Sequence, residues 1–373
     1  MGKQVVLAAG DGYGALERWL ADSGARHILL VCGGSIRLLA LDRFFRELPR
    51  RTGIRVTRFS GFAPNPSYQS VVDGVRVFQR GGCDLVAAVG GGSAMDVAKC
   101  IRLYGRLDPD RSFDEQEPIP NPAELLAVPT TAGSGSEATR FAVIYREGVK
   151  LSVADDRCLP TAVLLDPAVL RPLPELQRKC TMLDALCHGL ESFWSVNACP
   201  ESRALSAQAI RLLLAHVDAY LRREDGGDAA MQRAAYLAGQ AINLTQTTAG
   251  HAMAYGLTTR YGLPHGQAAA MCVARLWPFM VYYPEPCAAS GGAAGLKRTF
   301  RELAGAMGCE SARDAVRRFQ ELLDRLDLPR PGAVEEDIPG LVRGVNAQRL
   351  KNNPVALSPE AIGRLYREIL LNT

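Results

Sequence analysis

The spacing of apolar residues changes once along the chain, after Asp166-Pro167, and this change constrains the fold more than any other feature. Before it, short runs rich in β-branched residues alternate with amphipathic stretches such as 14–22 and 68–80. The runs predict strands over 5–8, 27–32, 55–59, 84–89 and 125–128. Strands that alternate with helices favour a parallel sheet with helices packed on its faces.

Further strands, or a hairpin around Glu147-Gly148, are predicted over 139–145, 151–154 and 162–165. After Pro167 the apolar spacing is mostly that of helices, as over 202–221, 229–245 and 312–326. A chain of 373 residues is long enough for two hydrophobic cores. We therefore predict an α/β domain over residues 1–168 and an all-α domain over residues 169–373.

A glycine-rich turn joins the predicted strand at 84–89 to a predicted helix. The turn contains Gly90, Gly91 and Gly92, and Ser93 is expected to be the helix N-cap, with Asp96 at the capping-box position. Backbone N–H groups at the start of such a helix can bind a phosphate. The pattern is neither Gly-x-Gly-x-x-Gly nor a P-loop, and glycine turns also occur between strands and helices without any ligand.

A second loop, Pro129 to Glu137, follows the predicted strand at 125–128. Its small residues permit close backbone approach, and its hydroxyls can bind polar ligand atoms; they belong to Thr130, Thr131, Ser134 and Ser136. Taken alone, it reads as a solvated Gly/Ser loop. Because two such loops each end a strand, together they favour a nucleotide site at the edge of the sheet.

Four residues in apolar surroundings have the chemistry of a metal site: Asp184, His188, His251 and His265. Asp184 and His188 are four residues apart, so both lie on one face of the predicted helix. One carboxylate and three imidazoles suit Fe(II), Zn(II) or a similar divalent ion. The alternatives are an ordinary helix-face pair, a turn at Pro264-His265-Gly266, and histidines satisfied within the core.

Composition excludes several classes of function. The net charge of +4 is small and dispersed, which argues against a nucleic-acid partner. The ten cysteines form no Cys-x-x-Cys pair, so a thiolate zinc site or dithiol redox centre is not expected. With no N-terminal basic-plus-apolar signal and no apolar run long enough for a membrane span, we expect a cytoplasmic protein.

The order and spacing of these motifs resemble the iron-dependent (group III) alcohol dehydrogenases, which are related in fold to dehydroquinate synthase. The match is carried by 90–99, 129–137, Asp184, His188, His251 and 264–266, and it extends over nearly the whole chain. The resemblance implies a Rossmann-like N-terminal domain, a helical C-terminal domain and a cleft between them. It assigns the four metal ligands to Asp184, His188, His251 and His265, and it implies a homodimer.

Within that family the chain resembles the NADPH-using branch. NAD-preferring members carry an aspartate near the position of Gly33, which would repel a 2′-phosphate. Here Gly33 leaves room, Ser35 can donate a hydrogen bond and Arg37 supplies positive charge, so NADPH is expected to be favoured over NADH. The expected cofactor-binding residues are Gly33, Ser35, Arg37, Asn65, Gly90, Gly91, Gly92, Ser93, Asp96, Thr130, Thr131, Ser134 and Ser136.

One position departs from the family pattern. Many members have a further histidine four residues after the third ligand, often invoked in proton relay, and here that position is Tyr255. A phenol, with an unperturbed pKa of about 10, is a poorer proton shuttle at neutral pH. Tyr255 is nevertheless the residue expected to act in catalysis, beside water or a ribose hydroxyl as other sources of the proton.

A narrower resemblance is to the phosphonoacetaldehyde reductases, over segments that include 139–145, 179–187, 192–197, 241–249 and 349–355. A phosphonate needs cations and amide donors, and the available ones are Arg140, Arg260, Lys351, Asn352 and Asn353; each is also an ordinary surface or capping residue. The expected reaction is the reduction of phosphonoacetaldehyde to 2-hydroxyethylphosphonate by hydride transfer from NADPH. The alternatives are a generic aldehyde, alcohol or diol dehydrogenase, a lyase or cyclase like dehydroquinate synthase, and a catalytically silent nucleotide-binding protein.

Overall fold

The computed structural model describes residues 4–10 and 12–371. The chain forms two compact units, one that runs to Leu173 and one that begins at Pro174. No helix in the described part of the chain is long and apolar enough to cross a membrane. All ten cysteines are free, and most of them are buried.

The first unit is built on a six-stranded parallel sheet with the order β1-β8-β5-β4-β2-β3. Its strands are β1 Val5–Ala8, β2 His27–Cys32, β3 Arg55–Phe59, β4 Leu85–Gly90, β5 Glu124–Pro129 and β8 Ala162–Leu165. The central strands β2 and β4 are buried along their whole length, as their continuous apolar sequences require in a sheet covered on both faces.

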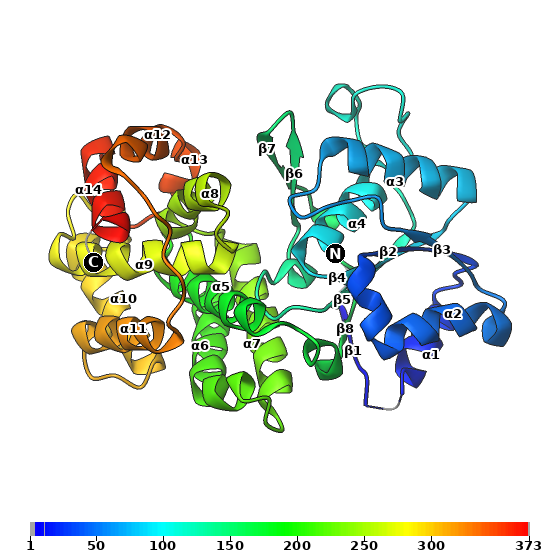
Figure 1. Ribbon diagram of the computed structural model, residues 1–373, viewed down its shortest axis with the longest axis horizontal. Helices are drawn as coiled ribbons and strands as arrows, with labels where there is room; N and C mark the ends of the chain where they lie inside the picture. Colours follow the sequence, from blue (N-terminus) through cyan, green and yellow to red (C-terminus); the bar gives the residue numbers. More distant parts are fainter. Residues whose placement is uncertain (1–3, 11, 372–373) are drawn as a thin grey trace. The chain divides into compact units, whose positions relative to one another are not determined.

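Helices cover both faces of this sheet. In Figure 1, α3 (Tyr68–Gly81) and α4 (Gly92–Tyr104) lie above the strands, and α1 (Gly14–Asp22) and α2 (Ala40–Thr52) lie below them. The antiparallel pair β6 (Phe141–Arg146) and β7 (Val149–Ala154) forms the predicted hairpin, with Glu147 and Gly148 both at positive φ in its turn. Short 3₁₀ helices are η1 Gly34–Leu38, η2 Phe113–Glu115, η3 Ser136–Ala138, η4 Asp156–Cys158 and η5 Pro167–Leu170.

Strand order brings three of the predicted loops to the same edge of the sheet. Cys32 at the end of β2 pairs with Val89 of β4, and Gly90 at the end of β4 pairs with Pro129 at the end of β5. The loops that follow β2, β4 and β5 therefore start side by side. From β2 the next strand along the chain, β3, is added on one side, whereas from β4 the next strand, β5, is added on the other side. The strand order therefore reverses between β2 and β4, and ligands of open α/β sheets bind at such a switch point.

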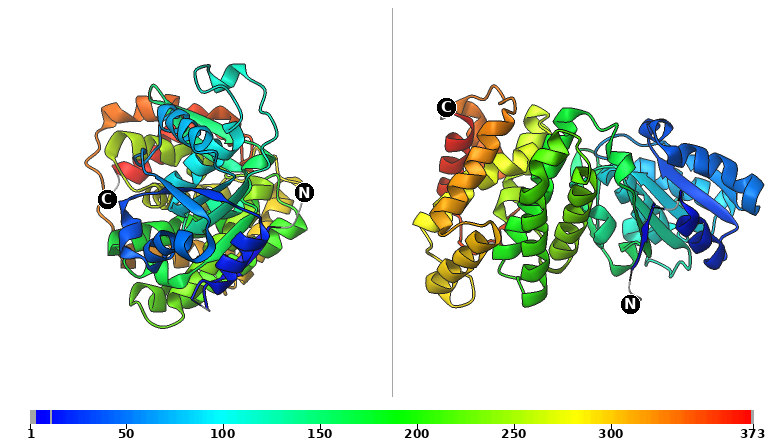
Figure 2. Two further views of the ribbon diagram at one scale, coloured as in Figure 1. Left: turned by 90° about the vertical axis from the view of Figure 1, so that its right-hand side faces the viewer. Right: turned by 90° about the horizontal axis from the view of Figure 1, so that it is seen from below.

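The second unit is helical. Its elements are α5 Glu175–Trp194, α6 Pro200–Leu221, α7 Gly227–Thr245, α8 Ala249–Tyr261, α9 His265–Tyr282, α10 Gly292–Ala306, α11 Ala312–Leu326, η6 Glu335–Asp337, α12 Ile338–Arg343, α13 Ala347–Leu350 and α14 Pro359–Leu370. Helix α5 is central, because it packs against α6, α7 and α9, while α8 packs against α9. The long helices α6 and α7 lie side by side (Figure 2). The predicted fold class, an α/β domain followed by an all-α domain, is confirmed.

Candidate metal centre and nucleotide loops

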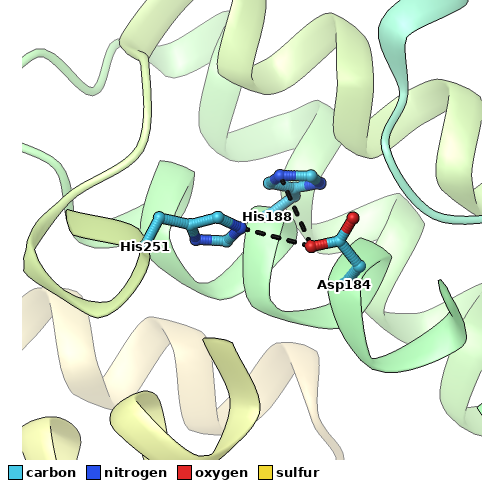
Figure 3. A group of neighbouring side chains, drawn as sticks. All are labelled: Asp184, His188 and His251. Atoms are coloured by element: carbon cyan, nitrogen blue, oxygen red, sulfur yellow. Dashed lines mark hydrogen bonds and ion pairs between the residues drawn. The ribbon is translucent and has the colours of Figure 1, made fainter. Parts of the chain in front are cut away.

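Three of the predicted ligands lie together in the second unit. Asp184 and His188 stand on α5 and His251 on α8, all three are buried, and one ligand atom from each lies within 4.8 Å of the other two. The Asp184 Oδ1 atom is 3.4 Å from Nε2 of His251 and 4.0 Å from Nε2 of His188 (Figure 3). This buried carboxylate–imidazole set fits a divalent metal ion.

The fourth predicted ligand, His265, lies next to His251. It is the first residue of α9, where Pro264 precedes the helix, so the segment is a helix start rather than an isolated turn. Its ring centroid is 5.4 Å from that of His251, with the two planes at 63°. On its other side His265 stacks on Tyr255 of α8, with centroids 5.0 Å apart.

Two glycines next to ligand histidines let the three helices approach one another. A Cβ atom on Gly266 would lie 1.9 Å from the Cys180 carbonyl oxygen and 2.7 Å from Cβ of Asp184. A Cβ atom on Gly250 would lie 2.9 Å from Glu191 Oε1 and 2.7 Å from Val273. A side chain on Gly266 would require the backbone of α5 to move, and one on Gly250 would displace the side chains of Glu191 and Val273. Local sequence thus sets the spacing of the site.

Glu191, which sequence reasoning did not assign, supports His251 from behind. Its carboxylate accepts hydrogen bonds from Nδ1 of His251 and from the Thr248 hydroxyl at 2.6 Å. It also accepts from the backbone N–H groups of Thr248 at 3.2 Å and His251 at 3.3 Å, at the N-terminus of α8. A hydrogen bond at Nδ1 directs Nε2 of His251 toward the ligand group. Its position in the sequence could have indicated this role, because Glu191 follows His188 by three residues on the same face of the helix.

Burial and charge act in opposite directions on these groups. Burial disfavours the ionised carboxyl of Asp184, but the imidazoles of His188, His265 and His251 hold its pKa well below the usual range. Burial would lower the pKa of His251, but the carboxylates of Glu191 and Asp184 outweigh it and raise the pKa to about 9. Burial also opposes ionisation of Glu191, yet His251 keeps its pKa low. The carboxylates are thus balanced by protons on the imidazoles, and a divalent cation bound here would replace those protons.

The two predicted nucleotide loops contact each other in the first unit. The Thr130 N–H donates to the Gly90 carbonyl oxygen at 3.0 Å, and a Cβ atom on Gly91 would lie 3.3 Å from the Thr131 side chain. The N-cap of α4 is Gly91, and no side chain caps it. The predicted N-cap Ser93 is therefore wrong, because Gly91 starts the helix and Ser93 lies inside the first turn. First-turn N–H groups without a side-chain cap suit a phosphate.

Asp96 does not form the predicted capping box either. It accepts a hydrogen bond from the Ser136 hydroxyl at 3.1 Å, and burial raises its pKa to about 6. The ammonium of buried Lys99 donates to Ser136 Oγ at 2.8 Å, Thr139 Oγ1 at 3.1 Å and the Phe141 carbonyl oxygen at 2.7 Å. Thr130, Ser136 and Thr139 are buried as well, so the reading of this loop as solvated is wrong.

The residues expected to select the cofactor lie after β2 and β3. Gly33 precedes the 3₁₀ helix η1, which holds Ser35 and Arg37, and both of these side chains are exposed. No atom of the described chain lies within 4 Å of the place where a Cβ on Gly33 would stand. Asn65 is exposed in the loop after β3, with φ of 56°.

The predicted substrate residues are divided between the two units. Arg140, in the first unit, pairs with Asp156 at 3.5 Å. Arg260, in the second unit, pairs with Asp337, so its charge is already balanced. Lys351 is exposed.

The two amides of that predicted set are bound within the protein. Asn352 donates to the Thr247 carbonyl oxygen at 3.2 Å and accepts from the Asn197 amide at 3.1 Å. Asn353 donates to the Val355 carbonyl oxygen at 2.7 Å and is buried. Neither amide contacts a metal ligand among the described residues.

Models of the two parts of one protein family match this chain. Residues 5–167 match the model for "Iron-containing alcohol dehydrogenase", and residues 179–370 match that for "Fe-containing alcohol dehydrogenase family, C-terminal". The chain is 35% identical to the phosphonoacetaldehyde reductase of Streptomyces viridochromogenes over 302 aligned residues, and the match covers 76% of either protein. It is 30% identical to the 1,3-propanediol dehydrogenase of Klebsiella pneumoniae over 360 aligned residues, and this match covers 92% of either protein.

The fold has solved counterparts. The iron-containing alcohol dehydrogenase of Thermococcus thioreducens superposes with a TM-score of 0.88 at 24% identity, covering 100% of this chain and 99% of that one. Since both units and both ends of the chain are matched, the protein belongs to the iron-containing alcohol dehydrogenase family and is an oxidoreductase of that class.

Proposed function

We propose that this protein is a metal-dependent, NADPH-linked reductase that converts phosphonoacetaldehyde to 2-hydroxyethylphosphonate. The observation that carries the reductase activity is the buried group of Asp184, His188 and His251 in a chain of this family. The phosphonate substrate is supported by the 35% identity to the Streptomyces viridochromogenes phosphonoacetaldehyde reductase.

In this proposal Asp184, His188, His251 and His265 hold the metal ion, Fe(II) or another divalent ion. The bound ion supplies Lewis-acid chemistry, polarising the carbonyl oxygen of an aldehyde. Glu191 holds Nδ1 of His251, so that Nε2 stays available as a ligand atom. Burial of the ligand side chains excludes water from them and strengthens their electrostatic interactions.

The first unit would bind the dinucleotide. The N–H groups at the start of α4 and the hydroxyls of Thr130, Thr131 and Ser134 provide donors for the diphosphate. The clamp of Lys99 on Ser136 keeps the second loop in place. The proposed proton donor to the product oxygen is Tyr255, which stacks on His265.

NADPH is the proposed cofactor because the open space at Gly33 and the exposed Arg37 suit a 2′-phosphate. Initial rates with NADPH and NADH test this proposal. Arg37→Ala should raise the KM for NADPH and leave the KM for NADH nearly unchanged. A wild-type preference for NADH would overturn the cofactor assignment.

The second candidate function is that of a short-chain aldehyde, alcohol or diol dehydrogenase. It is favoured by the match to the Klebsiella pneumoniae 1,3-propanediol dehydrogenase, which extends over 92% of both chains. Protein purified anaerobically and loaded with Fe(II) should be assayed with phosphonoacetaldehyde, propanal and 3-hydroxypropanal at equal concentrations of NADPH. A kcat/KM at least tenfold higher for phosphonoacetaldehyde supports the first proposal, and a higher value for an uncharged aldehyde supports the second.

A cytoplasmic homodimer completes the proposal. Ten free cysteines suit a reducing compartment, and light scattering after size-exclusion chromatography tests the dimer.

A further inference from the structure

We infer that Arg349 recognises the anionic group of the substrate and so selects aldehydes that carry a phosphonate or a similar anion. Arg349 belongs to the short helix α13, ninety-eight positions after His251 along the chain. This inference rests on the proposed reductase function, because it names the residue that gives that function its substrate class.

Arg349 lies next to the metal centre through one aromatic ring. Its guanidinium carbon is 5.4 Å from the centroid of Tyr255, over the face of the ring. The same ring stacks on His265, the proposed fourth ligand. The ring of Tyr255 thus contacts both the guanidinium of Arg349 and the proposed ligand His265.

No carboxylate of the described residues pairs with Arg349. Over residues 4–10 and 12–371 its guanidinium makes one hydrogen bond, from Nη1 to the uncharged hydroxyl of Thr247 at 2.9 Å. Arg260 and Arg140, by contrast, are paired with Asp337 and Asp156. A guanidinium has five N–H donors, so most of those on Arg349 remain for a ligand.

The segment that positions Arg349 is held in a costly conformation. Gln246 has φ of 60° and ψ of 175°, a region that residues other than glycine rarely occupy. Asn352 holds the next carbonyl group, that of Thr247, at 3.2 Å. The following residue, Thr248, donates to Glu191 behind the metal ligand His251. One short strained segment therefore positions both Thr247, which binds Arg349, and Thr248, which binds Glu191.

The chemistry of a guanidinium fits a phosphonate. Its planar donors bind two oxygens of one anion at once, and charge assistance makes such bonds about twice as strong as neutral ones. An uncharged aldehyde of the same length gains nothing from this interaction. Arg349 breaks and forms no bond; it acts through binding and orientation alone.

The test compares wild-type protein with Arg349→Gln, both loaded with Fe(II), on phosphonoacetaldehyde and on propanal, with sulfoacetaldehyde as a second anionic substrate. We expect the ratio of the two kcat/KM values to fall by about 10- to 100-fold, through a higher KM for phosphonoacetaldehyde. Ethylphosphonate, which cannot react, should inhibit the wild type competitively and the variant far more weakly. Arg349→Lys, which keeps the charge but not the fork of donors, should lie between the two.

Two controls distinguish a loss of substrate selectivity from a general disruption of the protein. Arg343→Gln, at an exposed arginine that ends α12, should change neither the ratio nor the inhibition. Iron content and the thermal midpoint of Arg349→Gln should equal those of the wild type, since Arg349 touches no ligand atom.

Each outcome decides the inference. If the wild type prefers phosphonoacetaldehyde and Arg349→Gln keeps that preference, the inference is wrong and the proposed function stands. If the wild type rejects phosphonoacetaldehyde but prefers sulfoacetaldehyde in a manner that depends on Arg349, the inference stands and the proposed substrate is wrong. If the wild type prefers propanal to both anionic aldehydes and ethylphosphonate does not inhibit it, both are wrong.

Discussion

Each unit of the protein buries a cluster of charged side chains, and the two clusters differ in how their charge is balanced. In the first unit the Lys99 ammonium has three hydrogen-bond acceptors and lies near the Asp96 carboxylate, so the cation belongs to the protein itself. In the second unit the carboxylates of Asp184 and Glu191 meet imidazoles, which carry a positive charge only when protonated. The first cluster is therefore a structural clamp, and the second has the composition of a site for an added metal ion.

A buried cluster of charged side chains can stabilise the fold or bind a metal ion. A buried charge that is fully hydrogen-bonded within the chain stabilises one arrangement of loops, here the two nucleotide loops. Buried carboxylates and imidazoles whose ligand atoms converge on one point have the arrangement of a metal centre. Variants of the two clusters should therefore fail in different ways, one in stability and the other in metal content.

The largest expected effect is that of His265→Ala. Loss of the fourth proposed ligand should remove the iron and lower kcat/KM by about 1,000-fold or more, since a Lewis-acid metal contributes several kcal/mol. Iron measured by mass spectrometry alongside the aldehyde assay checks this result. His216→Ala, on α6 and outside the group, serves as the control. Retention of a full equivalent of iron by His265→Ala would restrict the site to Asp184, His188 and His251.

A second variant, Lys99→Met, should break the clamp in the first unit. It keeps the length of the side chain but leaves Asp96 without its cation, which should lower the free energy of unfolding by about 3 kcal/mol. Urea unfolding measures this loss, with Lys297→Met on the exposed face of α10 as the matched control. Iron content should stay at the wild-type level. A variant as stable as the control would contradict the role of Lys99 as a clamp.

A smaller effect is expected from Glu191→Gln. The amide fills the same space but accepts a weaker hydrogen bond from Nδ1 of His251, so iron affinity should fall by about 10- to 100-fold. Competition with a chelator of known affinity measures this change without any assay of activity. Gln240→Glu, on α7 outside the ligand group, tests whether a change of charge alone matters. An unchanged iron affinity would mean that His251 needs no support from Glu191.

The smallest effect concerns pH. Burial raises the pKa of Glu137, in η3, to about 7. An acid with a pKa raised by folding contributes stability below its unfolded pKa, and this contribution is lost as pH rises through about 7. The wild type should thus lose stability relative to Glu137→Gln between pH 6 and pH 8, on the order of 1 kcal/mol. Urea unfolding at both pH values measures it; Glu117→Gln, at an exposed position, should show no such difference.

Much of the fold could be predicted because its signals are local. The strands β1, β2, β3 and β8 begin and end at the predicted residues. The start of α4 was predicted wrongly, because Gly91 adopts an extended backbone directly after β4 and leaves Ser93 inside the helix. A serine after a glycine turn has the composition of an N-cap, and only the backbone angles tell the two arrangements apart.

The site was predictable as a set of residue types but not as a network. Asp184 and His188 share a helix turn, so their spacing places them together. The partner of Glu191 lies 60 residues away, and the acids that balance Arg140 and Arg260 lie on separate elements. The unbalanced charge of Arg349 has no signal in the sequence at all, because it depends on which acids are absent from its surroundings.

Gly250 and Gly266 have a consequence for how this enzyme tolerates mutation. Every single-nucleotide change that replaces a glycine introduces a side chain, and at Gly266 the first atom of that chain would overlap the Cys180 carbonyl group. Inactive variants recovered from random mutagenesis should therefore include some in which all four ligand codons are intact. In such variants the substituted residue lies next to a ligand in the sequence, and activity is lost because two helices can no longer pack at the same distance.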